Sequence, residues 1–263
     1  MRVINLNKQI ELIVKFIKMQ LFSSGLSKLI VGLSGGIDSS VTAALCVKAI
    51  GNENVYGVML PYRKSHPDSL NDALKVADNL GIKHEQIDIS LMVDSYFKNY
   101  FPDANILRKG NRMARERMCV LYDLSAKYGA LVAGTGNFSE LMIGYCTQYG
   151  DNACAFEPIG HLYKTEIYKL AEILELPESV ITKKPTADLW EGQTDEEEMG
   201  ITYKEMDEIL FQILEKKSNE ADMIAEFNNE TINKVKKMIK NSEFKRRMPQ
   251  LIELNGGNYE KNT

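Results

Sequence analysis

The sequence predicts an α/β protein with a doubly wound parallel sheet and a helical C-terminal part. Up to Ala133, short apolar runs alternate with longer segments that have a helical period. Beyond residue 160 the strand-like runs disappear, and apolar residues recur at helical spacing. Strands that alternate with helices form parallel β-α-β units. A glycine-rich turn directly follows the first apolar run, where such sheets bind ligands.

The predicted elements follow one another along the chain. The first twenty residues form an amphipathic helix rather than a signal peptide. The predicted strands are Leu29–Leu33, Val55–Leu60, Lys83–Ile89 and Ala130–Ala133. The predicted helices are Ser39–Ile50, Asp68–Leu80, Leu91–Lys98, Asn111–Lys127, Tyr163–Leu174, Tyr203–Glu215 and Thr231–Asn241. We expect one domain over residues 1–250 and a flexible tail over residues 251–263.

The composition is that of an ordinary globular chain of 263 residues, with 44% hydrophobic and 26% charged residues. No apolar run reaches the roughly 20 residues of a membrane span, so no membrane partner is expected. The net charge of −4 argues against nucleic acid as a partner. The four cysteines show neither a CxxC pair nor zinc-like spacing. We expect them to be small buried side chains in a cytoplasmic protein.

The segment LIVGLSGGIDSS, residues 29–40, predicts a phosphate site. A buried strand ends in a turn whose glycines permit close approach of an anion and positive φ. Asp38, Ser39 and Ser40 then lead into a helix, whose first N–H groups would face the turn. The Gly-Lys-[Ser/Thr] ending of a Walker A loop is absent. The alternative is a serine- and glycine-rich connection that binds nothing.

A second polar turn, GTGNFSE from Gly134 to Glu140, follows the fourth predicted strand. Because the carboxyl ends of parallel strands meet at one edge, both turns should border one crevice. Asp38 and Glu140 are then two carboxylates beside a polyphosphate, the setting in which Mg²⁺ binds. The alternative is that each carboxylate merely stabilises a helix N-terminus, by ~0.3–1 kcal/mol.

Three other charged positions have both a functional and an ordinary explanation. Lys164 falls near a helix start, where the helix dipole disfavours a cation unless an anion lies nearby; otherwise it is solvated. Arg115, in NRMARERM, contacts a ligand or belongs to an exposed charged face. The acidic run Asp195–Glu198 is most simply a solvated helix start. It lies in Lys183–Gly200, a connection long enough to be either functional or disordered.

The motifs together resemble those of the NAD synthetases, over about residues 5 to 250. Five segments occur in the order seen in that family: GLSGGIDSS, NRMARERM, GTGNFSELMIGYCTQYGD, PIGHLYKTEIYKLA and KKPTADLWEGQTDEEEMG. The first resembles the PP-loop of the N-type ATP pyrophosphatases, which cleave ATP between its α and β phosphates. The last is the strongest discriminator, since other PP-loop families lack it. The resemblance implies the adenine-nucleotide alpha-hydrolase-like type of sheet.

The resemblance also implies an activity. Such an enzyme adenylates the nicotinate carboxylate of deamido-NAD with Mg²⁺ and ATP, and ammonia then displaces AMP to give NAD. The family is a homodimer that binds deamido-NAD across the subunit interface. Glutamine-dependent relatives carry an additional nitrilase-like domain, for which this chain has no room. We therefore expect ammonia to be the nitrogen donor.

Position by position, the resemblance assigns site residues. Asp38 and Glu140 match the magnesium ligands, and Asp151 matches a catalytic aspartate near the nicotinate. The ATP-binding positions are Gly32, Leu33, Ser34, Gly35, Gly36, Ile37, Asp38, Ser39, Thr135, Lys164 and Thr186. The deamido-NAD positions are Arg115, Gln148, Asp151, Phe244 and Lys245. Many relatives have lysine in place of Gln148 and a His-Lys pair in place of Phe244-Lys245, so these two substrate contacts differ here.

Two other readings remain open at this point. One is another PP-loop enzyme, such as a tRNA-thiolating enzyme or the synthetase half of a GMP synthetase. A thiolase would have reactive or cluster-binding cysteines and a basic surface, which this chain does not clearly offer. The other is a regulatory module that senses ATP without chemistry, which the presence of both Asp38 and Glu140 disfavours.

Overall fold

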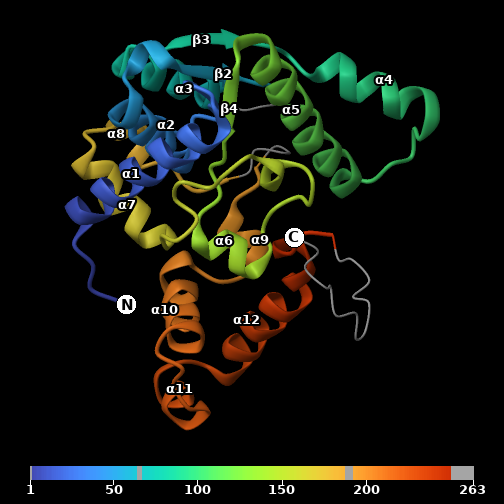
Figure 1. Cartoon of the computed structure of the whole chain (residues 1–263). Coiled ribbons are helices and arrows are strands. Elements are labelled where there is room, and N and C mark those ends of the chain that lie inside the picture. Colours follow the sequence, from blue (N-terminus) through green and yellow to red (C-terminus); the bar gives the residue numbers. More distant parts are fainter. Residues whose placement is uncertain (1, 64–66, 187–191, 250–263) are drawn as a thin grey trace, which may run out of the picture.

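The computed structural model describes residues 2–63, 67–186 and 192–249. Four strands form one parallel sheet in the order β3-β2-β1-β4. They are β1 (Lys28–Gly32), β2 (Val55–Met59), β3 (Lys83–Gln86) and β4 (Ala130–Ala133). The chain winds outward from β1 to β3 and then returns to place β4 on the other side of β1 (Figure 1). The switch point between β1 and β4 is therefore where a ligand crevice is expected.

Helices cover both faces of the sheet (Figure 1). Leu29 and Val31 of β1 pack into one apolar cluster, whereas Ile30 between them packs into another. The first cluster includes residues of α1 (Leu6–Ser24), α2 (Ile37–Ile50), α3 (Pro67–Leu80), α7 (Lys164–Ile173) and α8 (Glu178–Ile181). The second includes residues of α4 (Ser90–Tyr100) and α5 (Ile106–Tyr128). The predicted doubly wound parallel sheet is confirmed.

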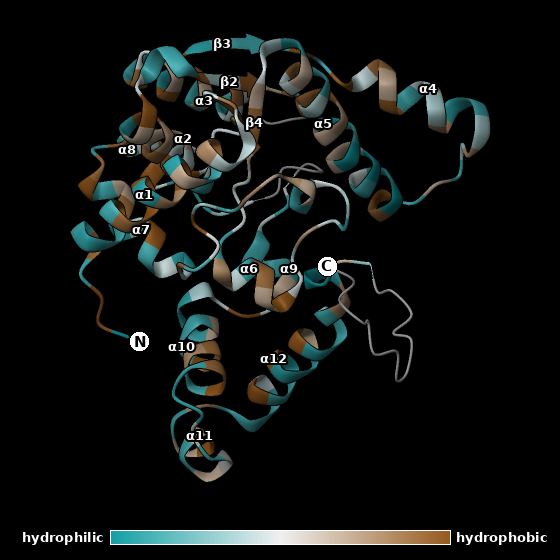
Figure 2. Cartoon of the chain, in the orientation of Figure 1, coloured by the Kyte–Doolittle hydropathy of each residue, from teal (hydrophilic) through white to brown (hydrophobic). Residues whose placement is uncertain are grey.

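The C-terminal part is helical, as predicted, and has an apolar cluster of its own. Met206 and Ile209 meet Ile232 and Val235 in this cluster, and all four are completely buried. Hydrophilic and hydrophobic residues alternate along α12, the last long helix (Asn229–Asn241; Figure 2). The helices of this part are α6 (Phe138–Ile143), α9 (Asp195–Met199), α10 (Tyr203–Leu214), α11 (Glu220–Glu226) and α12 (Asn229–Asn241). Three short 3₁₀ turns are η1 (Asn52–Asn54), η2 (Asp151–Ala153) and η3 (Glu243–Arg246).

Several boundaries differ from the prediction for local reasons. Strand β3 ends at Gln86, although the N–H groups of Ile87 and Ile89 still donate to Met59 and Pro61. Helix α5 begins at Ile106, before the predicted Asn111, because the Asn105 side chain caps it by accepting from Arg108 N. Helices α6, α8 and α11 are too short for a helical period to stand out. The predicted tail, residues 251–263, lies outside the described residues.

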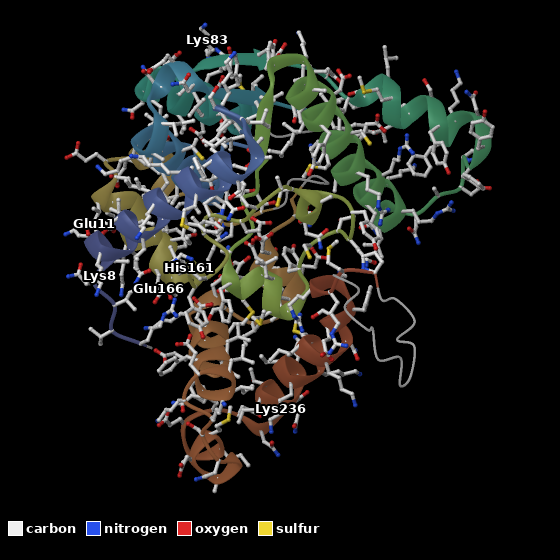
Figure 3. The ribbon with its side chains drawn as sticks, in the orientation of Figure 1. Lys8, Glu11, Lys83, His161, Glu166 and Lys236 are labelled. Atoms are coloured by element: carbon white, nitrogen blue, oxygen red, sulfur yellow. The ribbon has the colours of Figure 1, made fainter. Side chains whose placement is uncertain are left out.

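The N-terminal arm is fixed to the start of α7. Arg2 forms a two-point ion pair with Glu166, and it also donates to the carbonyl oxygen of His161. Figure 3 labels both partners, which lie beside the N-terminal segment. The Arg2 guanidinium also lies 5.0 Å from the centre of the Tyr163 ring. These contacts join the first residues of the chain to the helix that carries Lys164.

All four cysteines are free. Cys46 is completely buried, as expected, and Cys146 and Cys154 are half-buried. The expectation of burial is wrong for Cys119, which is exposed on α5 because it lies on the face of that helix turned away from the sheet. In the described part of the chain, no helix is both long enough and apolar enough to cross a membrane.

Candidate active site

The turn after β1 is shaped by one glycine in particular. Gly35 has a φ of +75°, and a side chain there would place its Cβ 2.0 Å from the Ser69 carbonyl oxygen of α3. Gly36 has a φ of −89° and is the N-cap of α2, so positive φ is needed only at Gly35. Without a side chain, Gly36 cannot cap the first N–H groups of α2. They remain for an anion.

The turn after β4 meets the first turn through Asn137. This residue is the N-cap of α6, and its Oδ1 accepts from Glu140 N at 3.0 Å. Its Nδ2 donates to Asp38 Oδ1 at 2.8 Å. Asp38 lies in the first turn of α2, which begins at Ile37 rather than at the predicted Ser39. The two predicted metal ligands are therefore brought to one place, from the ends of neighbouring strands.

Lys164 lies between the two carboxylates. Its Nζ donates to Asp38 Oδ2 at 2.5 Å and to Glu140 Oε1 at 3.0 Å. Its side chain is only 3% exposed, so the interpretation of a solvated lysine is wrong. Burial lowers the pKa of Lys164, but Asp38 and Glu140 outweigh burial and raise the pKa above its usual value. The lysine is thus held as a cation at the first residue of α7.

Two tyrosines extend this cluster to α9. The Tyr203 hydroxyl has two acceptors within reach of its one hydrogen, Asp195 Oδ2 at 3.0 Å and Glu140 Oε1 at 3.1 Å. The Tyr145 hydroxyl likewise has two acceptors, Glu198 Oε2 at 2.8 Å and Asp195 Oδ1 at 3.1 Å. Asp195 is 4% exposed, so the expectation of a solvated acidic run is wrong for this residue, although the predicted helix start is present. Burial raises the pKa of Asp195, which Lys164 opposes.

A cleft of about 580 Å³ opens over this cluster. Glu140 lines it, together with most of the predicted ATP-binding positions. The exception is Gly35, which packs against α3 beneath the turn. The predicted ATP-binding residues that line the cleft are Gly32, Leu33, Ser34, Gly36, Ile37, Asp38, Ser39, Thr135, Lys164 and Thr186.

The predicted deamido-NAD positions do not all share this cleft. Asp151 and Lys245 line it, whereas Gln148 and Phe244 line a second cavity of about 380 Å³. Arg115 is exposed on α5 and donates from Nε to the Gln148 carbonyl oxygen at 3.1 Å. Lys245 donates from Nζ to two carbonyl oxygens of the segment 144–146. Substrate contacts at Arg115 and Phe244 would thus lie outside the main cleft.

Asp151 lies at the wall of the cleft that faces the segment 144–147. Its Oδ1 accepts from Thr147 N at 2.8 Å, which fixes the carboxylate. Burial raises the pKa of the Asp151 carboxyl above its usual value. The side chain is nevertheless exposed to solvent on the side that lines the cleft. Sequence reasoning did not single out three other residues of the site: Asn137, Tyr145 and Tyr203. Only Asn137 had a local signal, an N-cap residue three positions before Glu140.

The chain matches known proteins over nearly its whole length. The family model described as NAD synthase matches residues 9–249. An NH(3)-dependent NAD(+) synthetase from Fusobacterium nucleatum subsp. nucleatum is 48% identical over 252 residues, which are 95% of this chain and 97% of that protein.

Two solved structures are also similar. An NH3-dependent NAD synthetase from Campylobacter jejuni has a TM-score of 0.81 and 35% identity, over 95% of this chain and all of that one. An NMN synthetase from Francisella tularensis has a TM-score of 0.86 and 29% identity, over 96% of this chain and all of that one. The family model spans the phosphate turn, the Asp38–Lys164–Glu140 cluster and the residues that line the cleft. The chain therefore belongs to the NAD synthase family.

Proposed function

We propose that this chain is an ammonia-dependent NAD synthetase, a ligase that forms a C–N bond. A carboxylate oxygen of the nicotinate of deamido-NAD attacks the α-phosphorus of ATP, and pyrophosphate leaves. Ammonia then attacks the acyl carbon, AMP leaves with the electrons of the broken C–O bond, and the nitrogen loses one proton to solvent to give the neutral amide. Adenylation is needed because a free carboxylate is a poor electrophile. The 48% identity to an NH(3)-dependent enzyme supports the choice of ammonia over glutamine.

The main support for the proposal is that the glycine-rich turn after β1 and the Asp38–Lys164–Glu140 cluster border the same cleft. The first turn of α2 offers backbone N–H groups, and Lys164 offers a positive charge in the same cleft. These groups suit a polyphosphate, which we propose to be the triphosphate of ATP. Thr135 and Thr186 line the same cleft, and we propose that they contact the rest of the nucleotide.

We propose Asp38 and Glu140 as the ligands of a Mg²⁺ ion that binds with ATP. Their donor set fits, because Mg²⁺ is usually held by one or two carboxylates plus substrate phosphates. Both carboxylates already lie around one cationic group, the Lys164 ammonium. When bound, the ion supplies neutralisation of the charge that develops on the leaving pyrophosphate.

The test is product analysis with ATP, MgCl₂, ammonium chloride and deamido-NAD. NAD, AMP and pyrophosphate are expected in equal amounts, whereas stoichiometric ADP and phosphate would contradict the proposal. A parallel reaction with glutamine and no ammonium should show a negligible rate. Pyrophosphate release separates this activity from an ATP sensor without chemistry.

Amidation of the nicotinate mononucleotide is a second candidate, because the similar Francisella structure is that of an NMN synthetase. Gln148 and Phe244 also replace two residues that contact the dinucleotide in many relatives. Comparing kcat/KM for deamido-NAD and for the mononucleotide under equal ATP and ammonium decides between them. We expect the dinucleotide to be the better substrate.

We also propose that the enzyme is a homodimer. Arg115 and Phe244 lie outside the main cleft, where a second subunit would be needed to enclose a ligand that they contact. The segment that contains α4 and the start of α5 carries several exposed large apolar side chains. Its exposed members are Leu91, Met92, Tyr100, Phe101, Ile106 and Leu107.

A further inference from the structure

Asn137 joins two parts of the site that lie 99 residues apart in the chain. The residue is completely buried, with 0% exposure. Its Nδ2 holds Asp38 Oδ1, while Lys164 holds Asp38 Oδ2, so each oxygen of this carboxylate has its own partner. Its Oδ1 holds the backbone of Glu140. One carboxamide therefore contacts both predicted ligands of the metal ion.

Helix capping alone does not explain an asparagine here. Serine and aspartate cap helices about as well as asparagine, because capping needs only an acceptor oxygen. Neither offers an N–H donor to Asp38, and aspartate would place a second negative charge beside it. Asn105 shows the simple case, since it caps α5 through Oδ1 from an exposed position.

The backbone at this turn is held independently of the Asn137 side chain. Phe138 N donates to the Leu162 carbonyl oxygen at 2.8 Å, and Gly136 N donates to Glu157 Oε2 at 2.9 Å. The peptide group that follows Asn137 and the one that precedes Gly136 are thus anchored. Loss of the Asn137 amide N–H should release the Asp38 carboxylate and leave α6 in place.

We infer that Asn137 is a positioning residue that fixes the orientation of the Asp38 carboxylate relative to Glu140, and thereby sets the affinity for the Mg²⁺–ATP pair. The inference rests on the proposed function. In this role Asn137 Nδ2 orients the Asp38 carboxylate, while Asn137 Oδ1 caps α6.

The test uses Asn137→Ser and Asn137→Asp, both of which keep a capping acceptor. Mn²⁺ binding in the presence of ATP is measured by electron paramagnetic resonance, and the Mg²⁺ dependence of NAD formation is measured by kinetics. Because a hydrogen bond to a charged group is lost, we expect binding weakened about tenfold or more. The effect should be larger for Asn137→Asp, with the KM for deamido-NAD unchanged. Melting temperatures should stay close to that of the unsubstituted protein.

Asn219→Ser and Asn219→Asp are the matched controls, since they alter the exposed cap of α11, a helix that does not line the cleft. Metal binding like that of the unsubstituted protein in both Asn137 variants would overturn the inference. Weakened metal binding that appears only with a large fall in melting temperature would also overturn it, in favour of capping alone. Absence of NAD formation by the unsubstituted protein would instead refute the proposed function, while the Mn²⁺ measurement would still test Asn137.

Discussion

Single residues in this site are organised by charge balance. Asp38 and Glu140 come from two different turns, and each would destabilise the other if no cation lay between them. Lys164 provides that cation from the first residue of α7, where the helix dipole alone would disfavour it. The attraction between Lys164 and the two carboxylates outweighs the unfavourable effect of the helix dipole, so the three residues stabilise one another.

Removing either carboxylate should weaken metal-dependent turnover. We expect Asp38→Asn and Glu140→Gln each to lower kcat at least about 100-fold, because a lost ion ligand leaves charge on pyrophosphate uncompensated. The Mg²⁺ concentration for half-maximal rate should rise as well. Steady-state kinetics over a Mg²⁺ series measures both, with the exposed Glu172→Gln of α7 as control. Normal rates at limiting Mg²⁺ would show that the metal assignment is wrong.

Among the elements, α10 holds the first turns of α6 and α7, the helices that carry Glu140 and Lys164. Asp207 of α10 accepts from Ser139 Oγ in α6, and from Thr165 N and Oγ1 in α7 at 2.9 and 2.8 Å. Ser139 Oγ in turn accepts from Lys164 N at 2.9 Å. Helix α10 therefore positions the helices that bear Glu140 and Lys164.

The buried Asp207 should make stability depend on pH. Burial raises its pKa to about 6, against the opposing hydrogen bond from Ser139, whereas the unfolded chain has a value of about 3.9. Between these values the folded state keeps a proton that the unfolded state has lost. Stability should therefore fall as pH rises from about 4 to 6, by about 3 kcal/mol, and level off above.

Urea unfolding over this pH range, for the unsubstituted protein and for Asp207→Asn, measures the contribution as a difference. The slope should be shallower in Asp207→Asn, because this side chain no longer titrates. Asp123→Asn, at an exposed position of α5, should leave the slope unchanged. Parallel curves for Asp207→Asn and the unsubstituted protein would contradict the assignment.

Elements with strong local patterns were predictable, and contacts between distant turns were not. The apolar run before Gly32 and the glycines after it indicate a strand and a phosphate turn without reference to the rest of the chain. The neighbours of Lys164 depend on the β1–β4 pairing, so its pattern was equally consistent with a solvated side chain. Asp195 was misinterpreted because acidic runs are usually solvated, whereas Tyr145 and Tyr203 bury this one.

At the scale of the whole molecule, one side of the sheet ends in an apolar surface. Leu91 is 78% exposed on α4, and Ile106 is 53% exposed at the start of α5. Figure 1 shows these two helices on the same side of the molecule. Exposed apolar patches mark interaction sites in soluble proteins, and we propose that the exposed apolar side chains of α4 and of the start of α5 form one. The same helix α5 carries Arg115, so a subunit interface here would bring a second chain close to that residue.

Placing charges on this surface should dissociate the proposed dimer. We expect Leu91→Asp combined with Ile106→Asp to shift the mass seen by light scattering from dimer to monomer, because carboxylates would be buried in the interface. Phe22→Asp is the control, since Phe22 is 89% exposed on α1, which covers the other face of the sheet. A dimer that persists in the double variant would place the interface elsewhere.

The ammonium group of Lys164 gives the carboxylates of Asp38 and Glu140 a counter-ion from within the chain. We therefore expect folding and metal binding to be separate events, because one positive charge of the chain already offsets part of the two negative charges. A chelator should abolish NAD formation yet leave the melting temperature unchanged, and added Mg²⁺ should restore activity without refolding. Thermal melts with and without EDTA check this, and a lower melting temperature in EDTA would mean that the metal is part of the fold.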